Sequence, residues 1–492
     1  MRPLWLAWAS ASAASFSETC LSFKPEFAAS TLSRLEHIPA NTTLQLDSVP
    51  SCNRRSQAVQ TELCRVALQI ATSGRSGISF ELWLPAQWSG RLLATGNGGV
   101  DGCIKYEDLA YGAAHGFAVV GTNNGHNGTT GVEFLNNPDV IEDFAYRALH
   151  TGTSAAKSLV EAFYGTAPAR SYYIGCSLGG RMGISAAERF PDDYDGIVAG
   201  APAVDFNNLY GSRANFFTIT GAPGSPDYIP IDTWTSVIHP EVLRQCDGID
   251  GVVDGIIEVP SKCHFDPSVL LCADQYGCLS AAQVKQVQQI YAPYTYPDGS
   301  LIFPRMNPGM ELRAVDGLLA GKPFSSSVEW FRYAVLNNPD WDPATYTVDD
   351  VRLAEQLQPS IKTYPQTLPF RGKLLVYHGG QDQQITSFNT ERFWDMADLG
   401  DARFFRISGM DHCGGGPGAW VFGQGGYAAG VFDPESNVLA AVVRWVENGT
   451  APETITGTKY VADDPSRGID FQRAHCRYPL EQTYTGSGWE CK

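Results

Sequence analysis

The most specific information about the fold lies in the stretch Ser171-Tyr-Tyr-Ile-Gly-Cys-Ser-Leu-Gly-Gly-Arg-Met-Gly183. Its first four residues form an apolar run typical of a buried strand, and the residues after Ser177 fit the start of a helix. Gly175–Gly179 matches G-x-S-x-G, in which a serine occupies a strained strand-to-helix turn between glycines that avoid a clash. Because the chain has 50 glycines, the motif gains its weight from this strand–turn–helix setting. It predicts an α/β-hydrolase core with a nucleophilic serine.

The same alternation of strands and helices continues on both sides of the motif. We expect strands at Ile78–Leu84, Arg91–Thr95, Gly116–Thr122, Tyr172–Gly175, Gly196–Gly200, Lys373–Tyr377 and Arg403–Ile407. We expect helices at Ile141–Tyr164, Gly179–Phe190 and Val438–Val446. A strand followed by a helix, repeated along the chain, indicates a mostly parallel sheet with helices on its faces.

The alternation stops between residues 205 and 369, where Pro, Asp, Tyr and Trp become frequent. Since the strand pattern resumes afterwards, this segment is interpreted as a lid inserted between two halves of one sheet. The predicted domains are a first core part at 17–204, the lid at 205–369, and a second core part with a C-terminal segment at 370–492.

Charge and the N-terminus indicate a secreted protein. The formal net charge of −17 disfavours nucleic acid and membrane surfaces as partners. Residues 1–16 have one basic residue, a short apolar run and then small residues, which resembles a signal peptide cleaved between Ala11 and Ser17. No later segment reaches the about 18 apolar residues of a membrane span.

Cysteine usage supports the same conclusion. The chain has 12 cysteines, an even number, and none lies in a CxxC pair, so disulfides in an oxidising compartment are the economical interpretation. Three Asn-x-Ser/Thr triplets are candidate glycosylation sites on a secretory route: Asn41, Asn127 and Asn448.

A serine nucleophile on this fold needs an acid and then a histidine later in the chain, each in a loop after a strand. Asp382 follows the strand that starts at Lys373, and His412 follows the strand that ends at Ile407. Asp411 is a poorer orienting acid because it is adjacent to His412, and His378 precedes the acid, against the chain order. A structural role for His412 in a Gly-rich turn is the alternative.

Two cysteines connect these candidates. Cys176 precedes Ser177, and Cys413 follows His412. A disulfide holds its two Cα atoms about 5.5 Å apart, so joining these cysteines would bring the serine and the histidine within reach of each other. The alternatives are coincidence or a His–Cys metal site, for which the usual ligand spacings are absent.

An oxyanion formed at the serine needs two backbone N–H donors. Leu178, directly after the nucleophile, is expected to supply one. The second is expected from the loop Thr95-Gly-Asn-Gly-Gly99, through Gly99 or Gly98. A phosphate-binding role for this loop is less favoured, because the P-loop Lys-Ser/Thr and the complete G-x-G-x-x-G are missing.

Within the predicted lid, Cys246-Asp-Gly-Ile-Asp-Gly-Val-Val-Asp-Gly-Ile256 places three carboxylates within eight residues. Carboxylates this close repel one another unless water or a cation separates them, and Ca²⁺ prefers carboxylate and carbonyl oxygens. The spacing is not that of an EF-hand. A solvated acidic turn and a Ca²⁺ loop both remain open at this point.

Taken together, these motifs resemble the tannase and feruloyl esterase family over nearly the whole mature chain. That family has a catalytic Ser, Asp and His, and a disulfide from the residue before the serine to the residue after the histidine. Here the matching positions are Cys176-Ser177, Asp382 and His412-Cys413. Its Gly-Asn-Gly-Gly oxyanion loop corresponds to Gly96–Gly99.

The resemblance implies further features of the site and of its surroundings. It implies a Ca²⁺ ion in the lid, held by Asp247, Asp250 and Asp254 and by the backbone carbonyls of Val252 and Ile256, and no organic cofactor. It implies the disulfides Cys20–Cys64, Cys52–Cys103, Cys176–Cys413, Cys246–Cys263, Cys272–Cys278 and Cys476–Cys491.

The resemblance also sets the functional expectation: a secreted feruloyl esterase that releases hydroxycinnamates from plant cell-wall polysaccharide such as xylan. A tannase acting on galloyl esters is the close alternative, and a non-catalytic binding protein on a hydrolase fold is the alternative of another class. Aromatic lid residues could stack on the acyl ring, although a role in the lid core is the plainer interpretation: Phe216, Phe217, Trp234, Trp330, Tyr333 and Trp341. The oligomeric state is left open.

Overall fold

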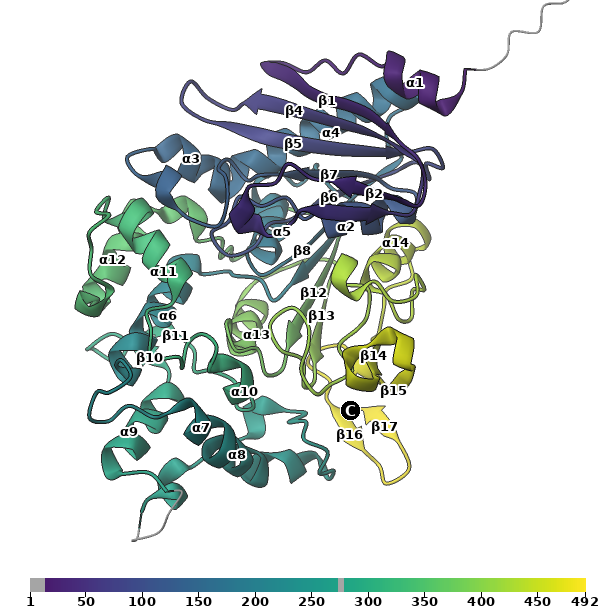
Figure 1. Cartoon of the computed structure of the whole chain (residues 1–492). Helices are drawn as coiled ribbons and strands as arrows, with labels where there is room; N and C mark the ends of the chain where they lie inside the picture. The colour runs from purple at the N-terminus through teal and green to yellow at the C-terminus, as the bar shows by residue number, and fades with distance from the viewer. Residues whose placement is uncertain (1–13, 273–277) are drawn as a thin grey trace, which may run out of the picture.

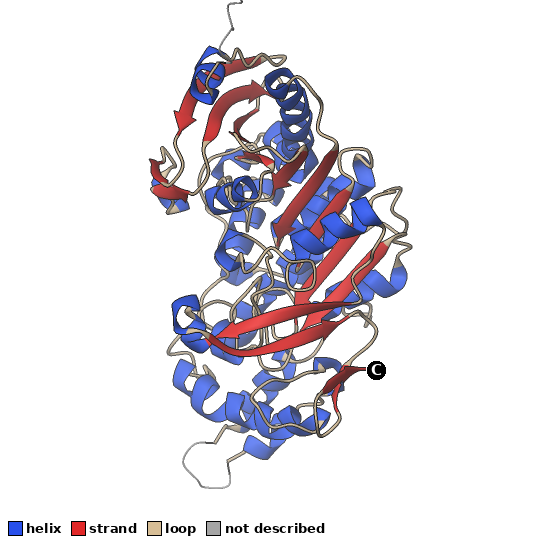
Figure 2. Ribbon diagram, turned by 90° about the vertical axis from the view of Figure 1, so that its right-hand side faces the viewer, coloured by secondary structure: helices blue, strands red, loops and turns tan. Residues whose placement is uncertain are grey.

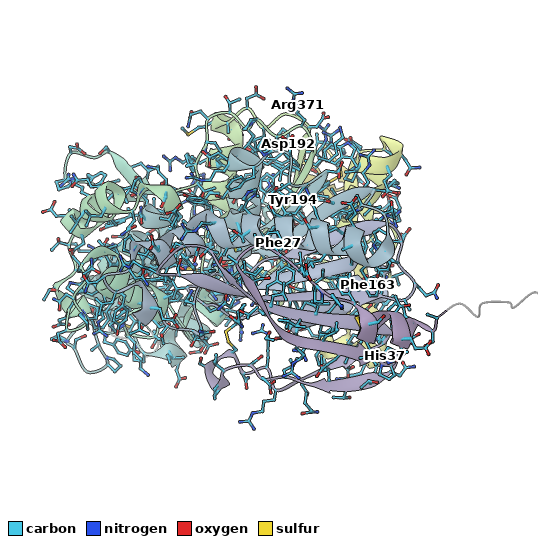
Figure 3. The ribbon with its side chains drawn as sticks, turned by 90° about the horizontal axis from the view of Figure 1, so that it is seen from above. Phe27, His37, Phe163, Asp192, Tyr194 and Arg371 are labelled. Carbon is cyan, nitrogen blue, oxygen red and sulfur yellow. A yellow bond between two sulfur atoms is a disulfide. The ribbon has the colours of Figure 1, made fainter. Side chains whose placement is uncertain are left out.

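The structure of this chain, a computed structural model, describes residues 14–272 and 278–492 (Figure 1). Most of the predicted signal peptide therefore lies outside the described residues. Its last residue, Phe16, begins helix α1, which Ser15 and Glu18 start with a reciprocal capping box. The Phe16 ring packs 6.2 Å from the ring of His37 and 5.9 Å from that of Phe163, both labelled in Figure 3. These contacts attach α1 to the edge of the main sheet.

One mixed sheet of nine strands organises the molecule, in the order β1-β4-β5-β7-β6-β8-β9-β12-β13. The pairs from β7 to β13 are parallel, and the pairs from β1 to β7 are antiparallel. The strands are β1 (Ser30–Ile38), β4 (Leu63–Ala71), β5 (Gly77–Pro85), β6 (Arg91–Thr95), β7 (Ala118–Thr122), β8 (Arg170–Cys176), β9 (Gly196–Gly200), β12 (Lys373–Gly379) and β13 (Ala402–Ile407). The predicted α/β class is confirmed.

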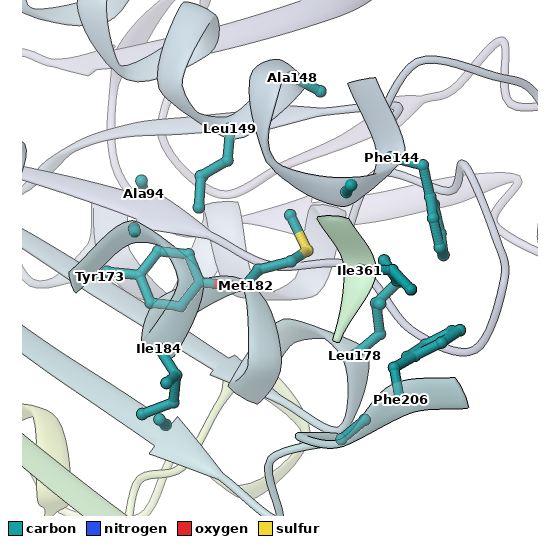
Figure 4. Packing of buried hydrophobic residues seen from close by; sticks show 14 of the residues in the cluster. Ala94, Phe144, Ala148, Leu149, Tyr173, Leu178, Met182, Ile184, Phe206 and Ile361 are labelled. Carbon is teal, nitrogen blue, oxygen red and sulfur yellow. The ribbon is translucent and has the colours of Figure 1, made fainter. Parts of the chain in front are cut away.

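Helices cover both faces of this sheet (Figure 2). Successive residues of a strand point to opposite faces, so Leu92 and Leu93 belong to different hydrophobic clusters, as do Tyr173 and Tyr172. One face packs against α4 (Ala148–Tyr164) and α5 (Leu178–Arg189), and the other against α2 (Tyr106–Ala114) and α14 (Val438–Asn448). Figure 4 shows part of the first cluster, which brings together Met182 of α5, Tyr173 of β8 and Leu149 of α4.

The segment predicted as a lid is mainly helical and lies to one side of the sheet, in teal and green in Figure 1. It has its own hydrophobic cluster, which includes Trp234, Val242 and Met310. Its helices and strands are α6 (Phe206–Thr220), α7 (Ile231–Thr233), α8 (His239–Cys246), α9 (Ala281–Ile290), β10 (Tyr294–Thr295), β11 (Leu301–Phe303), α10 (Glu311–Ala314), α11 (Ser325–Glu329) and α12 (Val348–Leu357). The predicted lid boundaries fall in the connections from β9 to α6 and from α12 to β12.

Shorter elements complete the chain: α1 (Phe16–Ser22), β2 (Thr42–Gln45), β3 (Ser56–Val59), α3 (Pro138–Glu142), α13 (Ser387–Met396), β14 (Thr454–Tyr460), β15 (Ile469–Cys476), β16 (Gln482–Tyr484) and β17 (Trp489–Cys491). The helix predicted from Ile141 is interrupted at its start, because a π-helical turn at Asp143–Arg147 separates α3 from α4. Over residues 14–272 and 278–492, no helix has both the length and the apolar character to cross a membrane.

Candidate active site

Ser177 lies at the sharp turn between β8 and α5. Its backbone has φ 65° and ψ −122°, a conformation that L side chains rarely adopt. The flanking glycines are required by close backbone approach: a Cβ on Gly175 would come 2.8 Å from the carbonyl carbon of Gly179, and one on Gly179 would come 3.0 Å from Asn97 O. The turn therefore holds the serine side chain out at the carboxyl end of the parallel strands.

The structure brings the three predicted side chains together. His412 Nε2 lies 2.9 Å from Ser177 Oγ, and His412 Nδ1 lies 2.7 Å from Asp382 Oδ2. The three residues follow β8, β12 and β13, which are close neighbours in the sheet. A base in contact with both a serine hydroxyl and a buried carboxylate is the arrangement that activates serine for nucleophilic attack.

The Asp382 carboxylate is fully buried and held from both of its oxygens. Oδ1 accepts hydrogen bonds from the backbone N–H groups of Gln384 at 2.7 Å and Ile385 at 2.8 Å. Oδ2 faces His412 and also His378 Nε2, at 3.2 Å. Burial alone raises the pKa of Asp382, but the two histidines and their hydrogen bonds outweigh it, so its pKa falls well below the ordinary value. Asp382 is thus held as a carboxylate.

Sequence reasoning missed two residues that hold this arrangement. Gln383 Oε1 accepts a hydrogen bond from the backbone N–H of His412 at 2.9 Å. His378, considered only as a rival base, instead contacts Asp382 from behind, and its Nδ1 lies 2.8 Å from Thr390 Oγ1. Its position four residues before the acid, at the end of β12, is the signal that could have revealed this contact. Asp411 makes a hydrogen bond with Gln381 at 3.2 Å rather than with the histidine.

A disulfide between Cys176 and Cys413 joins the nucleophile turn to the histidine loop, with its Cα atoms 6.0 Å apart. It connects positions 237 residues apart, directly beside Ser177 and His412. All six pairings implied by the resemblance are present: Cys20–Cys64, Cys52–Cys103, Cys176–Cys413, Cys246–Cys263, Cys272–Cys278 and Cys476–Cys491.

The backbone around Ser177 offers two unpaired donors for an oxyanion. Within the described part of the chain, neither the N–H of Leu178 nor that of Gly99 has a hydrogen-bond partner. Gly98, the other candidate, donates its N–H to Asp101 Oδ1 at 3.3 Å and is therefore engaged. Gly99 has φ +53°, which glycine adopts without strain. The geometry thus favours Leu178 and Gly99 as the donor pair.

A cavity of about 300 Å³ opens beside Ser177 and His412. Its lining mixes polar and apolar surface and comes mainly from the loop after β6, the start of α2, the nucleophile turn and the segment that follows the histidine. The residues are Gly96, Asn97, Gly98, Gly99, Asp101, Lys105, Glu107, Asp108, Gly175, Cys176, Ser177, Gln384, His412, Cys413, Gln424 and Tyr427. All of them belong to the two core segments.

The aromatic lid residues considered for ring stacking are largely internal. Phe216, Trp234, Trp330 and Trp341 are buried, whereas Phe217 and Tyr333 are half-buried. The burial of the first four agrees with a role in the lid core and its contact with the sheet domain. The three candidate glycosylation asparagines are exposed: Asn41, Asn127 and Asn448.

The acidic lid loop contains both free oxygen atoms and oxygen atoms that are already engaged in hydrogen bonds. Asp250 Oδ2 is buried without a hydrogen-bond partner, and the carbonyls of Val252 and Ile256 accept no hydrogen bond from the described residues. Asp247 is engaged by two backbone N–H groups, and Asp254 by Arg473 at 2.8 Å. Across residues 14–272 and 278–492, no three His, Cys, Asp or Glu side chains converge to hold a metal ion. The three free oxygens are of the kind that Ca²⁺ prefers.

Comparison with known proteins shows which family the chain resembles. The family model described as "Tannase and feruloyl esterase" matches residues 64–334 and 331–491. A "Probable feruloyl esterase B-2" from Aspergillus flavus is 53% identical over 489 residues, covering 95% of this chain and 94% of that protein. A protein of the same name from Aspergillus terreus is 46% identical, covering 92% of this chain and 91% of that protein.

Solved structures give the same picture. The crystal structure of feruloyl esterase B from Aspergillus oryzae superposes with a TM-score of 0.94 at 41% identity, covering 97% of this chain and 100% of that one. A tannin acyl hydrolase from Aspergillus niger superposes with a TM-score of 0.75 at 22% identity, covering 96% of this chain and 95% of that one, which shows a shared fold.

Proposed function

Because the chain belongs to the tannase and feruloyl esterase family, and is therefore a carboxylic ester hydrolase, we propose that it is a secreted feruloyl esterase. It releases ferulate and related hydroxycinnamates from feruloylated plant cell-wall polysaccharide such as xylan. The observation that carries the proposal is the contact series Ser177–His412–Asp382, at 2.9 and 2.7 Å, in a chain 53% identical to a probable feruloyl esterase.

The proposed reaction has two steps. His412 takes the proton of Ser177 while Oγ attacks the ester carbonyl, and Asp382 holds the histidine tautomer and stabilises its positive charge. The N–H groups of Leu178 and Gly99 stabilise the oxyanion. His412 then gives the proton to the leaving alcohol. Water, activated by the same histidine, hydrolyses the acyl-enzyme and releases the acid.

A feruloyl rather than a galloyl substrate is supported by the relatives. The two curated proteins at 53% and 46% identity carry the name feruloyl esterase, whereas the tannin acyl hydrolase is 22% identical and supports only the fold. A non-catalytic binding role is not supported, because the nucleophile, base and acid are all in contact.

We expect the wild type to hydrolyse methyl ferulate with a kcat/KM about 100-fold above that for methyl gallate. An acyl pocket shaped for an apolar methoxyphenyl group would leave the galloyl hydroxyls without hydrogen-bond partners. Such unpaired hydroxyls lower kcat/KM for the galloyl ester, relative to the feruloyl ester, by about this factor. Initial rates on the two methyl esters measure the ratio. A preference for methyl gallate would assign the enzyme to tannin hydrolysis instead.

Secretion and glycosylation are parts of the same proposal. Six disulfides, an N-terminal segment with signal-peptide character and three exposed Asn-x-Ser/Thr sites support an oxidising secretory route.

A Ca²⁺ ion in the lid is a further proposal. Asp247, Asp250 and Asp254, with the carbonyls of Val252 and Ile256, are the residues that would hold it. The buried, unpartnered Asp250 Oδ2 and the two free carbonyls support this set. Burial raises the pKa of Asp250, and repulsion from Asp254 and Asp247 adds to it, although a hydrogen bond from the N–H of Val252 opposes the shift; a bound cation would favour the charged carboxylate. The ion would stabilise the loop without a part in the chemistry.

Removal of the ion is expected to lower the thermal unfolding midpoint of the wild type. An ion that binds only the folded chain adds about 2.7 kcal/mol at about 100 times its Kd, so EDTA should lower Tm and excess Ca²⁺ should restore it. In Asp250→Asn this Ca²⁺-dependent shift should be lost, whereas in Asp227→Asn, an exposed lid position, it should persist. The same Tm with EDTA and with Ca²⁺ in the wild type would contradict the proposal.

A further inference from the structure

The cavity beside the nucleophile extends from the oxyanion loop to the segment after His412 and has no lid residue in its lining. Its lining includes His412, Cys413, Gln424 and Tyr427, and every lining residue belongs to the core. The lid contacts the cavity wall through two of its lining residues: Tyr210 on α6 donates a hydrogen bond to Gly99 O at 3.1 Å, and Arg213 donates to Gln384 O at 2.9 Å.

The chemistry decides which half enters this cavity. When Leu178 and Gly99 bind the oxyanion, the acyl chain and the leaving oxygen point away from each other across the attacked carbon. The leaving oxygen has to accept its proton from His412 Nε2, so it must lie on the histidine side. The half of the substrate that follows this oxygen is the alcohol.

Two side chains at the start of α2 suit a hydroxylated alcohol. Lys105 precedes the first turn of α2, and Asp108 lies three positions later, on the same side of the helix. The Lys105 ammonium has no hydrogen bond or ion pair with any described residue, and it lies beside Gly98, since a Cβ there would be 3.2 Å from Nζ. Asp108 Oδ1 accepts the N–H of Gly426 at 2.7 Å, and its Oδ2 has no partner in the described chain.

The neighbouring carboxylates do not neutralise this lysine by contact. Asp101 accepts the backbone N–H groups of Gly98 and Cys103, at 3.3 and 3.2 Å. Glu107 is held by two hydrogen bonds from Arg54, at 2.8 and 2.5 Å. A half-buried ammonium without a partner, inside a cavity, is a group that a ligand oxygen would satisfy.

Tyr427 adds an apolar surface at the mouth of the cavity. Its hydroxyl donates to Cys413 O at 2.5 Å, which fixes the ring, and the side chain remains 50% exposed. The ring borders Gly414, where a Cβ would come 3.0 Å from Tyr427 and 3.1 Å from Trp420. A fixed ring with a polar end is suited to a ligand with one apolar face and a hydroxylated edge, as a sugar has.

We propose that this cavity is the leaving-group subsite, that it takes a sugar ring, and that Lys105 and Asp108 hydrogen-bond to neighbouring hydroxyls of that ring while Tyr427 packs against its face. The inference rests on the proposed ester hydrolysis and names its alcohol half. Lys105 and Asp108 are specificity-determining residues in it, because they act on a part of the substrate that undergoes no bond change.

The test compares one acyl group on two alcohols. We measure kcat and KM on 5-O-feruloyl-arabinose and on methyl ferulate, for the wild type, Lys105→Met and Lys105→Arg. The kcat/KM ratio of sugar ester to methyl ester should fall about tenfold in Lys105→Met, the effect of losing a hydrogen bond to a charged group. The loss should appear mainly in KM, because the contact exists before and during the reaction. Lys105→Arg should recover part of the ratio.

A matched control is Lys285→Met, which removes a lysine from the exposed face of α9 in the lid. Its ratio should equal that of the wild type, and thermal unfolding checks that each variant folds. An unchanged ratio in Lys105→Met, or an equal loss on both esters, would overturn the subsite, since the second result places Lys105 at the acyl group or the oxyanion.

This test separates the subsite from the feruloyl assignment. If the wild type hydrolyses only galloyl esters, the feruloyl assignment fails, and the same ratio is measured on a glucose gallate and methyl gallate. A fall in that ratio in Lys105→Met still supports the sugar subsite. If the wild type hydrolyses neither pair of esters, the ester hydrolase proposal fails and the subsite fails with it.

Discussion

We expect Ser177→Ala to lower kcat for ester hydrolysis by about a millionfold, the size of loss seen when the nucleophile of such a triad is removed. The hydroxyl at 2.9 Å from His412 Nε2 is the only group in this contact series that can form the acyl-enzyme. A residual rate about 10³–10⁴ above the uncatalysed one should persist, because Leu178 and Gly99 can still stabilise an oxyanion formed by water.

Kinetics on methyl ferulate and labelling with a fluorophosphonate probe measure this effect. The matched control is Ser185→Ala, on the same helix α5, where the hydroxyl is buried without a hydrogen-bond partner. Ser185→Ala should keep both activity and labelling, and Ser177→Ala should lose both. Substantial activity in Ser177→Ala would mean that another residue attacks the ester.

Asp382→Asn is expected to lower kcat by about 10⁴-fold while leaving the fold intact. In the wild type, Asp382 Oδ1 accepts two backbone N–H groups, which leaves Oδ2 for His412 Nδ1. An asparagine must keep its carbonyl oxygen toward those N–H groups and so turns its NH₂ toward Nδ1. The histidine then carries its proton on Nε2 and cannot accept the proton of Ser177.

The control for this variant is Asp411→Asn, next to the histidine in the sequence. Asp411 hydrogen-bonds to Gln381 and makes no contact with the imidazole, so we expect less than about a tenfold change in kcat. Measured kcat values for the two variants distinguish the roles. A larger loss in Asp411→Asn than in Asp382→Asn would reverse the assignment of the orienting acid.

The parts of the fold that the sequence predicted are those with local signals. The strand–turn–helix around Ser177 and the parallel strands β6 to β9, β12 and β13 are short, apolar and bounded by turn residues. The antiparallel strands β1 and β4 were not predicted. In β4, the buried Arg65 forms an ion pair with Glu81 of the neighbouring strand β5, so what makes this arginine a core residue is a partner on another strand, which the local sequence of β4 does not show.

The residues of the site also fall into those that the sequence reveals and those that only the folded structure reveals. Ser177, Asp382 and His412 follow from the order of the chain and from the ends of strands, which a sequence displays directly. Lys105 and Tyr427 enter the cavity only because α2 and the segment after His412 pack against each other, and nothing in their local sequence marks them. The preference for Gly99 over Gly98 likewise depends on one hydrogen bond to Asp101, which forms only in the folded loop.

The division of the catalytic groups between the two core segments has a consequence for biosynthesis. The nucleophile is translated shortly before the lid, and its acid and base only after the lid, so a growing polypeptide carries a serine with no base beside it. The chain can therefore hydrolyse esters only late in its synthesis, once its final part has been made and β12 has paired with β9. We therefore expect fragments produced by premature termination to be inactive, and fragments produced by cleavage within the lid to be active only while the two pieces stay associated.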